Sequence, residues 1–181
     1  MRLQISKNFI YTGQSGPLLR FQGSSGEVFE LAVLDSNVFR FRFLPDGVPR
    51  LKRTWAITGL DRNFTTEEDS VPGPIPTLPL DVSREGRSRE DFSIFPCPPF
   101  EHYYHEGRYK VSTNGISVDI DLETLNLSWY YKGMTCFASD LPTKGYCYDL
   151  EGTEVFHYLK RAPEEFYYGL GERSGPLNKK G

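Results

Sequence analysis

Residues 114–133 read NGISVDIDLETLNLSWYYKG, and apolar side chains recur at every second position through most of this stretch. Such a period of two predicts strands that bury one face and leave the other in water. The expected inward positions are Ile116, Val118, Ile120, Leu122, Leu125, Leu127, Trp129 and Tyr131. Asn114-Gly115 is the preferred pair for a type I′ turn, in which both central residues need positive φ. With the segments on either side, 108–113 and 134–138, the stretch predicts an antiparallel meander of three to four strands.

An earlier segment shows the same alternation and predicts a hairpin. Residues 28–34 form an apolar strand, and a turn at 35–37 leads into a second strand at 37–44, NVFRFRFL. The inward side chains of the second strand are Phe39, Phe41 and Phe43. Arg40 and Arg42 fall on its other face, so we expect both guanidinium groups to point to solvent.

The long segment 61–99 differs from its surroundings because it is rich in Pro, Ser, Glu and Arg. Proline cannot donate to a strand ladder, which excludes a central strand from most of this segment. We expect an irregular excursion with one short edge strand near 78–82. Further strands are expected at 155–160 and 165–170, and no helical periodicity extends beyond about two turns. The patterns predict one all-β domain over residues 1–181, built as an antiparallel β-sandwich.

The overall composition excludes several classes of protein. The formal net charge is −3 and the Lys and Arg residues are scattered, which argues against a nucleic-acid partner. No run approaches the roughly 20 apolar residues that span a bilayer, and the first residues lack the apolar core of a signal peptide. The three cysteines, Cys97, Cys136 and Cys147, form no CxxC pair and argue against a disulfide framework. We therefore expect an intracellular, cytoplasmic protein with no membrane partner.

Two histidines close together suggest a metal site at first. His102 and His105 lie beside the carboxylates of Glu101 and Glu106. In an extended segment, residues three apart point to opposite faces, so the two imidazoles do not readily hold one ion. His157 sits in a strand pattern, where packing is the expected role. We predict no metal site.

Asp119 and Asp121 deserve a test as a catalytic pair. Two residues apart on one strand, they are separated by about 6–7 Å, within the roughly 5–9.5 Å range of glycosidase carboxylates. However, both occupy the polar face of an alternating strand, where exposure to solvent accounts for the charge. We therefore assign no catalytic residue.

An aromatic series lies around the same region and has two interpretations. Its members are Phe92, Phe95, Phe100, Tyr103, Tyr104 and Tyr109. Aromatic faces stack on the apolar faces of sugars, but a β-core also needs large side chains. Packing in the interior is the favoured interpretation.

The C-terminal segment 164–181, EEFYYGLGERSGPLNKKG, carries closely spaced glycines. For the dinucleotide-binding motif GxGxxG, Gly169 and Gly171 fit, but Ser174 occupies the third glycine position. No Gly-Lys-Ser/Thr occurs either, which excludes a phosphate-binding P-loop. The glycines suit a bulge or a close backbone approach after an aromatic strand, and we expect no nucleotide or other cofactor.

The same segment resembles a motif of one enzyme family. Gly169, Leu170, Gly171, Glu172 and Arg173 follow aromatic residues, as in the N-terminal domain of family-31 glycoside hydrolases, which are α-glucosidases, α-xylosidases and relatives. The NVFRFRF strand and the NGISVDIDLETLNLSWYYKG stretch are similar to that domain in order and spacing. The resemblance spans nearly the whole chain and implies a supersandwich of the galactose-mutarotase type, placed before a (β/α)₈ barrel.

The resemblance also implies where the chemistry lies. In the family, the aspartate nucleophile and the aspartate acid/base of retaining hydrolysis are on the barrel, and neither motif occurs in this chain. The last strands of the sandwich are expected beyond Gly181. We therefore expect a domain that is incomplete at its C-terminus and inactive alone. It would depend on a barrel in cis or on a separate chain, and would meet an α-glucoside or α-xyloside only through that barrel.

Two other functions remain open at this point. A stand-alone, lectin-like sandwich would bind sugar through Trp129 or the aromatics of 100–109. An aldose mutarotase, which shares the sandwich type, would need two histidines and a carboxylate that converge on one cleft.

Overall fold

In the computed structural model, the residues described are 2–48, 53–54, 87–88, 91–133, 135–151, 154–161 and 164. Within these ranges the regular structure consists of β-strands, and no helix long and apolar enough to cross a membrane is found. The strands are β1 Leu3–Ile5, β2 Ile10–Ser15, β3 Leu18–Gln22, β4 Val28–Asp35, β5 Val38–Leu44, β6 Arg53–Thr54, β7 Arg87–Ser88, β8 Glu101–His105, β9 Arg108–Ser112, β10 Ile116–Asp121, β11 Asn126–Tyr131, β12 Thr135–Ser139, β13 Tyr146–Asp149 and β14 Val155–His157.

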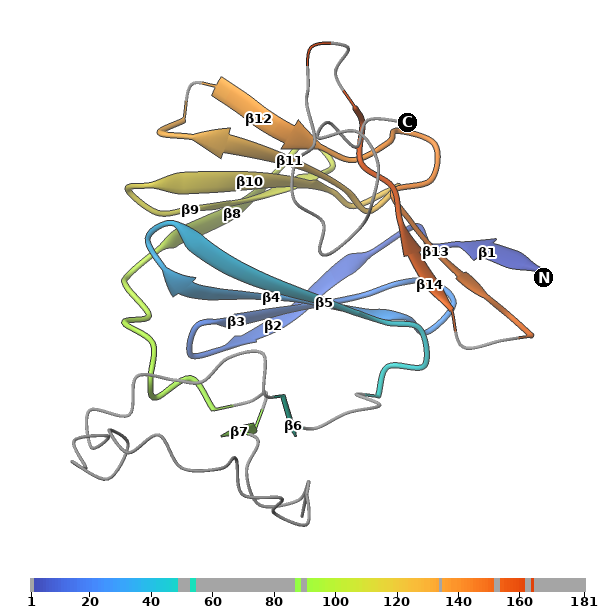
Figure 1. Ribbon diagram of the computed structural model, residues 1–181, viewed down its shortest axis with the longest axis horizontal. Helices are drawn as coiled ribbons and strands as arrows, with labels where there is room; N and C mark the ends of the chain where they lie inside the picture. The colour runs from blue at the N-terminus through green and yellow to red at the C-terminus, as the bar shows by residue number, and fades with distance from the viewer. Residues whose placement is uncertain are drawn as a thin grey trace, which may run out of the picture.

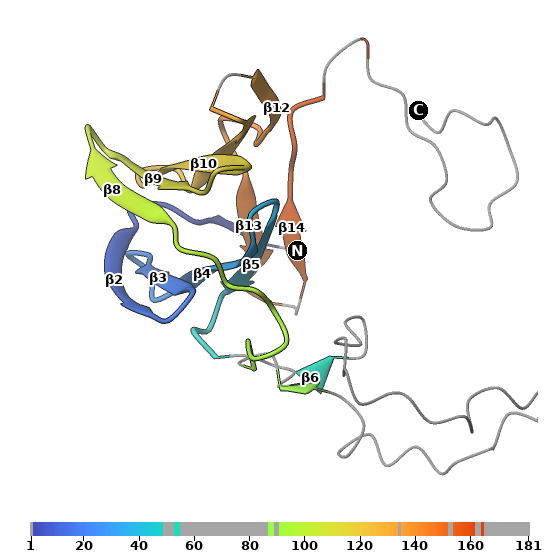
Figure 2. The ribbon, with the colours of Figure 1, turned by 90° about the vertical axis from the view of Figure 1, so that its left-hand side faces the viewer.

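The strands form two main antiparallel sheets that face each other (Figure 1). One has the order β2-β3-β4-β5, and the other has the order β12-β11-β10-β9-β8. A small sheet, β1-β13-β14, lies beside them, and β6 pairs with β7. Figure 2 shows β2 and β8 at one end of the sandwich and β5 and β12 at the other. The predicted all-β antiparallel sandwich is confirmed.

The core lies between the two main sheets. Its fully buried side chains include Phe21 and Phe29 from one sheet and Val118 and Ile120 from the other, with Tyr146 of β13 packed at one side. Burying one such side chain contributes about 1.5–3 kcal/mol relative to leaving it exposed. The alternation of the meander thus supplies one wall of the core, as expected.

The hairpin expected at 28–44 is present as β4 and β5, but its polar face is covered. Glu30 pairs opposite Arg42, and both side chains are buried. The Glu30 carboxylate accepts hydrogen bonds from Arg42 Nε at 2.7 Å and from Arg20 Nη2 at 2.6 Å. The Arg40 guanidinium lies over the ring of Phe92, 5.0 Å from its centroid. The expectation that both guanidinium groups point to solvent is therefore wrong. Arg42 is buried against Glu30, and Arg40 Nε and Nη2 are shielded from solvent where Phe92, from a remote segment, packs on this face.

The turn between β9 and β10 also differs from the prediction. Asn114 and Gly115 are absent from the residues with positive φ, so the turn is not type I′. Instead, Gly115 allows a close approach, because a Cβ at this position would lie 2.5 Å from the Ser36 carbonyl oxygen and would also meet Asn37 Oδ1. Positive φ at both central residues occurs in the turn Glu106-Gly107, between β8 and β9. Similarly, Lys132 and Gly133 both have positive φ between β11 and β12.

Several other expectations can be compared with the structure. The strands expected at 108–113, 116–122, 125–131 and 134–138 are present with shifts of one or two residues. The strand expected at 155–160 is shorter, Val155–His157, although Leu159 forms a bridge to Asp140. The strands expected at 78–82 and 165–170 lie outside the described residues, as does most of the excursion at 61–99. The extent of a single domain over 1–181 stays a prediction.

Candidate functional site

The first two histidines occupy opposite faces of β8 and do not form a common site. His102 Nδ1 lies 2.6 Å from the Tyr109 hydroxyl, and its Nε2 lies 2.9 Å from Gln14 Oε1. His105 is exposed, 3.7 Å from a carboxylate oxygen of Glu106. His102 therefore links the five-stranded sheet to β2 as a packing and hydrogen-bonding residue.

The third histidine belongs to a separate polar cluster. His157 Nε2 lies 2.7 Å from Asp140 Oδ1, and Asp140 Oδ2 accepts a hydrogen bond from the Leu127 N–H at 2.9 Å. The His157 ring stacks on Tyr146 at 4.3 Å between centroids. Burial, and secondly the nearby Asp140 charge, raise the pKa of Tyr146 well above its ordinary value. The cluster joins β14 to β11 and β13.

The positions of the histidines bear on two of the expected chemistries. The hydrogen-bonding, ionic and aromatic partners of His102, His105 and His157 have no residue in common. The described part of the chain thus offers no cleft with two histidines and a carboxylate, as a mutarotase would need. It also contains no group of three or more His, Cys, Asp or Glu residues suited to a metal ion.

The two aspartates of β10 have structural partners. Asp121 Oδ1 accepts hydrogen bonds from the backbone N–H groups of Glu123 at 2.9 Å and Thr124 at 3.1 Å, which fixes the turn into β11. Asp119 Oδ1 lies 3.9 Å from Lys110 Nζ. Both aspartates line a small polar groove of about 230 Å³ on the outer face of the sheet. The interpretation of a solvated polar face accounts for them.

The aromatic series is divided between the interior and the surface. Phe92 and Phe95 cover the outer face of β3 and β4, and Phe100 packs on the main core. Tyr109 is buried, and burial raises its pKa above the ordinary range, with Tyr11 as a further cause. Trp129, a sugar-contact candidate in the lectin-like hypothesis, also packs on the core. Tyr103 and Tyr104 are exposed, at 50% and 63%.

Two exposed aromatic side chains, Tyr11 and Tyr104, line a cleft between the edges of the two sheets. This aromatic cleft has a volume of about 520 Å³ and lies where β2 meets β8 and β9. It is lined by Asn8, Phe9, Ile10, Tyr11, Tyr104, Gly107, Tyr109, Leu122 and Glu123. Tyr11 stacks on Tyr109 at 4.9 Å. Sequence reasoning missed Tyr11, because no strand was expected before residue 28.

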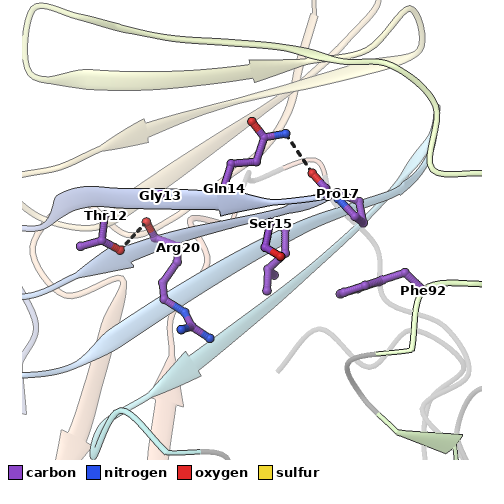
Figure 3. Close-up of a pocket in the computed structure, with 9 residues that line it drawn as sticks. Thr12, Gly13, Gln14, Ser15, Pro17, Arg20 and Phe92 are labelled. Carbon is purple, nitrogen blue, oxygen red and sulfur yellow. Dashed lines mark hydrogen bonds between the residues drawn. The ribbon is translucent and has the colours of Figure 1, made fainter.

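A second cleft, of about 640 Å³, lies on the β2–β3 hairpin (Figure 3). The polar side chains at this hairpin bond largely to the hairpin itself. Thr12 Oγ1 donates to the Arg20 carbonyl at 3.0 Å, and Gln14 Nε2 donates to the Gly16 carbonyl at 2.9 Å. The Arg20 guanidinium is bound to Glu30. This second cleft has a larger volume than the aromatic cleft, but its Thr12, Gln14 and Arg20 side chains already have partners within the protein.

The motif Gly169, Leu170, Gly171, Glu172 and Arg173 lies outside the described residues, so its geometry does not contribute to the site.

Comparison with known proteins identifies related domains. A family model described as the glycosyl hydrolase 31 N-terminal galactose mutarotase-like domain matches residues 28–181. Among solved structures, the GH31 dextranase FjDex31A of Flavobacterium johnsoniae, complexed with glucose, is similar with a TM-score of 0.65 and 15% identity. The match covers 96% of this chain and 17% of the dextranase.

A second similar structure is the protein lmo2446 of Listeria monocytogenes, solved with α-D-glucose, β-D-glucose, magnesium and calcium. Its TM-score is 0.64 at 13% identity, over 98% of this chain and 14% of that one. The chain thus spans less than a fifth of the length of these solved relatives. At such identities the structures support the fold alone. No curated protein sequence matches the chain significantly.

Proposed function

Because the chain belongs to the family of glycosyl hydrolase 31 N-terminal galactose mutarotase-like domains, we propose that it serves as the non-catalytic sandwich domain of a family-31 α-glycosidase. Its partner would be a (β/α)₈ barrel, in cis or on a separate chain, that hydrolyses O-glycosyl bonds of an α-glucoside or α-xyloside. The match of the family model over 28–181 carries this proposal. A cytoplasmic location is part of it, and cell fractionation tests that part.

The carboxylates of the described residues support a non-catalytic role. Retaining hydrolysis needs two carboxyl groups about 5–5.5 Å apart on either side of the scissile bond. Asp119 and Asp121 project from one face of one strand, and Asp121 is engaged in holding a turn. We therefore expect no turnover of aryl α-glucosides or α-xylosides by the chain alone.

Two strand edges at one end of the sandwich support a barrel contact. Among the described strands, β5 and β12 each pair on one side only, and they lie at the same end (Figure 2). Unpaired edges with apolar side chains are templates for association. Val38 of β5, 48% exposed, would contribute to such a contact.

Co-purification tests the proposal. The tagged chain is expressed from its own locus, and the polypeptides that elute with it are identified and assayed with p-nitrophenyl α-glucoside and α-xyloside. We expect a barrel-bearing polypeptide, either continuous with the chain or associated with it, and activity only in its presence. In the associated case, Val38→Lys should weaken recovery of the barrel, while Tyr103→Glu on exposed β8 should not. Hydrolysis by the chain alone, or a genome without a barrel that elutes with it, would contradict the proposal.

A further inference from the structure

We infer that the aromatic cleft between β2 and β8–β9 is a binding site for one pyranose ring of a neutral glucose oligosaccharide. This goes beyond the proposed function, which gives the chain no sugar contact of its own. Only the choice of glucose as the sugar rests on that function. The argument depends on the size of the cleft, the surfaces that line it and the rigidity of its supports.

The size and the surfaces of the cleft match an amphipathic ring. Its volume of about 520 Å³ falls within the range of roughly 300–1,000 Å³ typical of small-molecule sites. The rings of Tyr11 and Tyr104 supply aromatic surface, and Ile10 and Leu122 add aliphatic surface. A pyranose has a face of C–H groups that packs on such surface and a rim of hydroxyl groups that needs polar partners.

Two polar side chains lie at the cleft. Asn8 and Glu123 are both exposed and both line it. An amide both donates and accepts hydrogen bonds, and an ionised carboxylate accepts them, so together they satisfy sugar hydroxyls in either direction. A purely apolar ligand would form no hydrogen bonds with Asn8 and Glu123.

The backbone that carries these two residues is fixed in place. The Asn8 N–H donates to the Glu123 carbonyl at 2.7 Å, and the Phe9 N–H donates to the Leu122 carbonyl at 2.6 Å. Asp121 holds the Glu123 N–H from the other side, at 2.9 Å. A site that is already ordered loses less conformational freedom on binding, which favours affinity.

The aromatic floor is fixed as well. Tyr11 stacks on buried Tyr109, whose hydroxyl lies 2.6 Å from His102 Nδ1. His102 in turn is 2.9 Å from Gln14 Oε1 of β2, the strand that carries Tyr11. The stacked ring pair and its hydrogen-bonded support hold the Tyr11 ring in one orientation at the cleft.

Neighbouring tyrosines on β8 supply a matched test. Tyr104 lines the cleft, whereas Tyr103 is exposed on the opposite face of the same strand. Maltotriose and isomaltotriose are titrated into the ¹⁵N-labelled chain, with binding followed by chemical shifts and calorimetry. We expect saturable binding, with shifts at residues of the cleft. Tyr104→Ala should weaken the affinity at least about tenfold, while Tyr103→Ala should leave it unchanged.

Other outcomes would overturn the inference. It fails if neither sugar binds saturably, if Tyr104→Ala binds as the wild type does, or if both tyrosine variants lose affinity equally. Sedimentation of the free chain provides a further check on the occupant. A dimer that Tyr104→Ala dissociates would assign the cleft to a second copy of the chain and refute the sugar site. Both tyrosines are exposed, so neither substitution is expected to unfold the protein.

Discussion

Replacement of Gly115 by alanine tests the account of the β9–β10 turn. The added Cβ would lie 2.5 Å from the Ser36 carbonyl oxygen and would also meet Asn37 Oδ1. The Asn37 side chain can rotate away, but the Ser36 carbonyl is held by the Ile116 N–H at 3.2 Å and by Thr113 Oγ1 at 2.5 Å. To relieve the contact, the two turns must separate and lose both hydrogen bonds.

The size of the effect follows from those two bonds. Each intramolecular hydrogen bond contributes about 1 kcal/mol net, so we expect a loss of about 2 kcal/mol in the free energy of unfolding for Gly115→Ala. For a chain of this length such a loss lowers Tm by about 4–8 °C. Urea unfolding followed by circular dichroism measures the first quantity, and scanning calorimetry measures the second.

A second substitution separates close approach from turn conformation. Asparagine tolerates positive φ better than other non-glycine residues, so it would be accepted at Gly115 if that φ were the requirement. Because the requirement is space, Gly115→Asn should destabilise at least as much as alanine. The control is Gly107, which has a φ of +79° and no atom within 4 Å of an added Cβ, so Gly107→Asn should cost only the strain of positive φ, at most about 1 kcal/mol, and less than Gly115→Asn. Wild-type stability of either Gly115 variant would refute the reasoning.

Four further variants test the electrostatics of the fold. Glu30→Ala leaves the buried Arg42 guanidinium without its carboxylate and should lower the free energy of unfolding in urea by about 3–5 kcal/mol. Arg20 is 55% exposed, so Arg20→Ala should lower it by at most about 1 kcal/mol. Because the pKa of Tyr146 is raised in the folded state, its contribution to stability is complete below the ordinary value of 10.0 and is lost as pH rises above it. Tyr146→Phe should therefore flatten the decline of the free energy of unfolding at alkaline pH. An unchanged decline would contradict the assignment. The Asp149 carboxylate accepts the Arg2 N–H at 2.8 Å, which lowers its pKa below 3.8, so its contribution is present above that pH and lost as pH falls through the lower folded-state value. Asp149→Asn should therefore reduce the dependence of Tm on pH in acid.

The sequence predicts those strands whose two faces differ in environment. In β9, β10 and β11 the period of two is visible because one face meets the core and the other meets water. The period is absent in β8, which is exposed on both faces, and in β13, where three of four residues are buried. β8 and β13 therefore escaped the sequence analysis for opposite physical reasons, whereas the buried strand β4 was predicted from its apolar run.

The error at Arg40 and Arg42 has a related cause. Alternation along β5 identifies two faces, but it does not identify what covers each of them. The segment that carries Phe92 packs on the polar face from about fifty residues away in the chain. Phe92 covers the Arg40 guanidinium, and local periodicity contains no information about that long-range contact. The aromatic cleft escaped prediction in the same way, since Tyr11 and Tyr104 come together only through the approach of β2 to β8–β9.

The two proposed surfaces occupy opposite ends of the sandwich, and this makes them separable. The aromatic cleft lies at the end formed by β2 and β8, and the open edges of β5 and β12 lie at the other (Figure 2). Substitutions that are far apart and share no partners have nearly additive effects. Val38→Lys should therefore impair association with a barrel while leaving sugar binding intact, and Tyr104→Ala should do the reverse. If either variant changed both properties together, the two ends would be coupled through the core, and the assignment of separate roles to them would have to be abandoned.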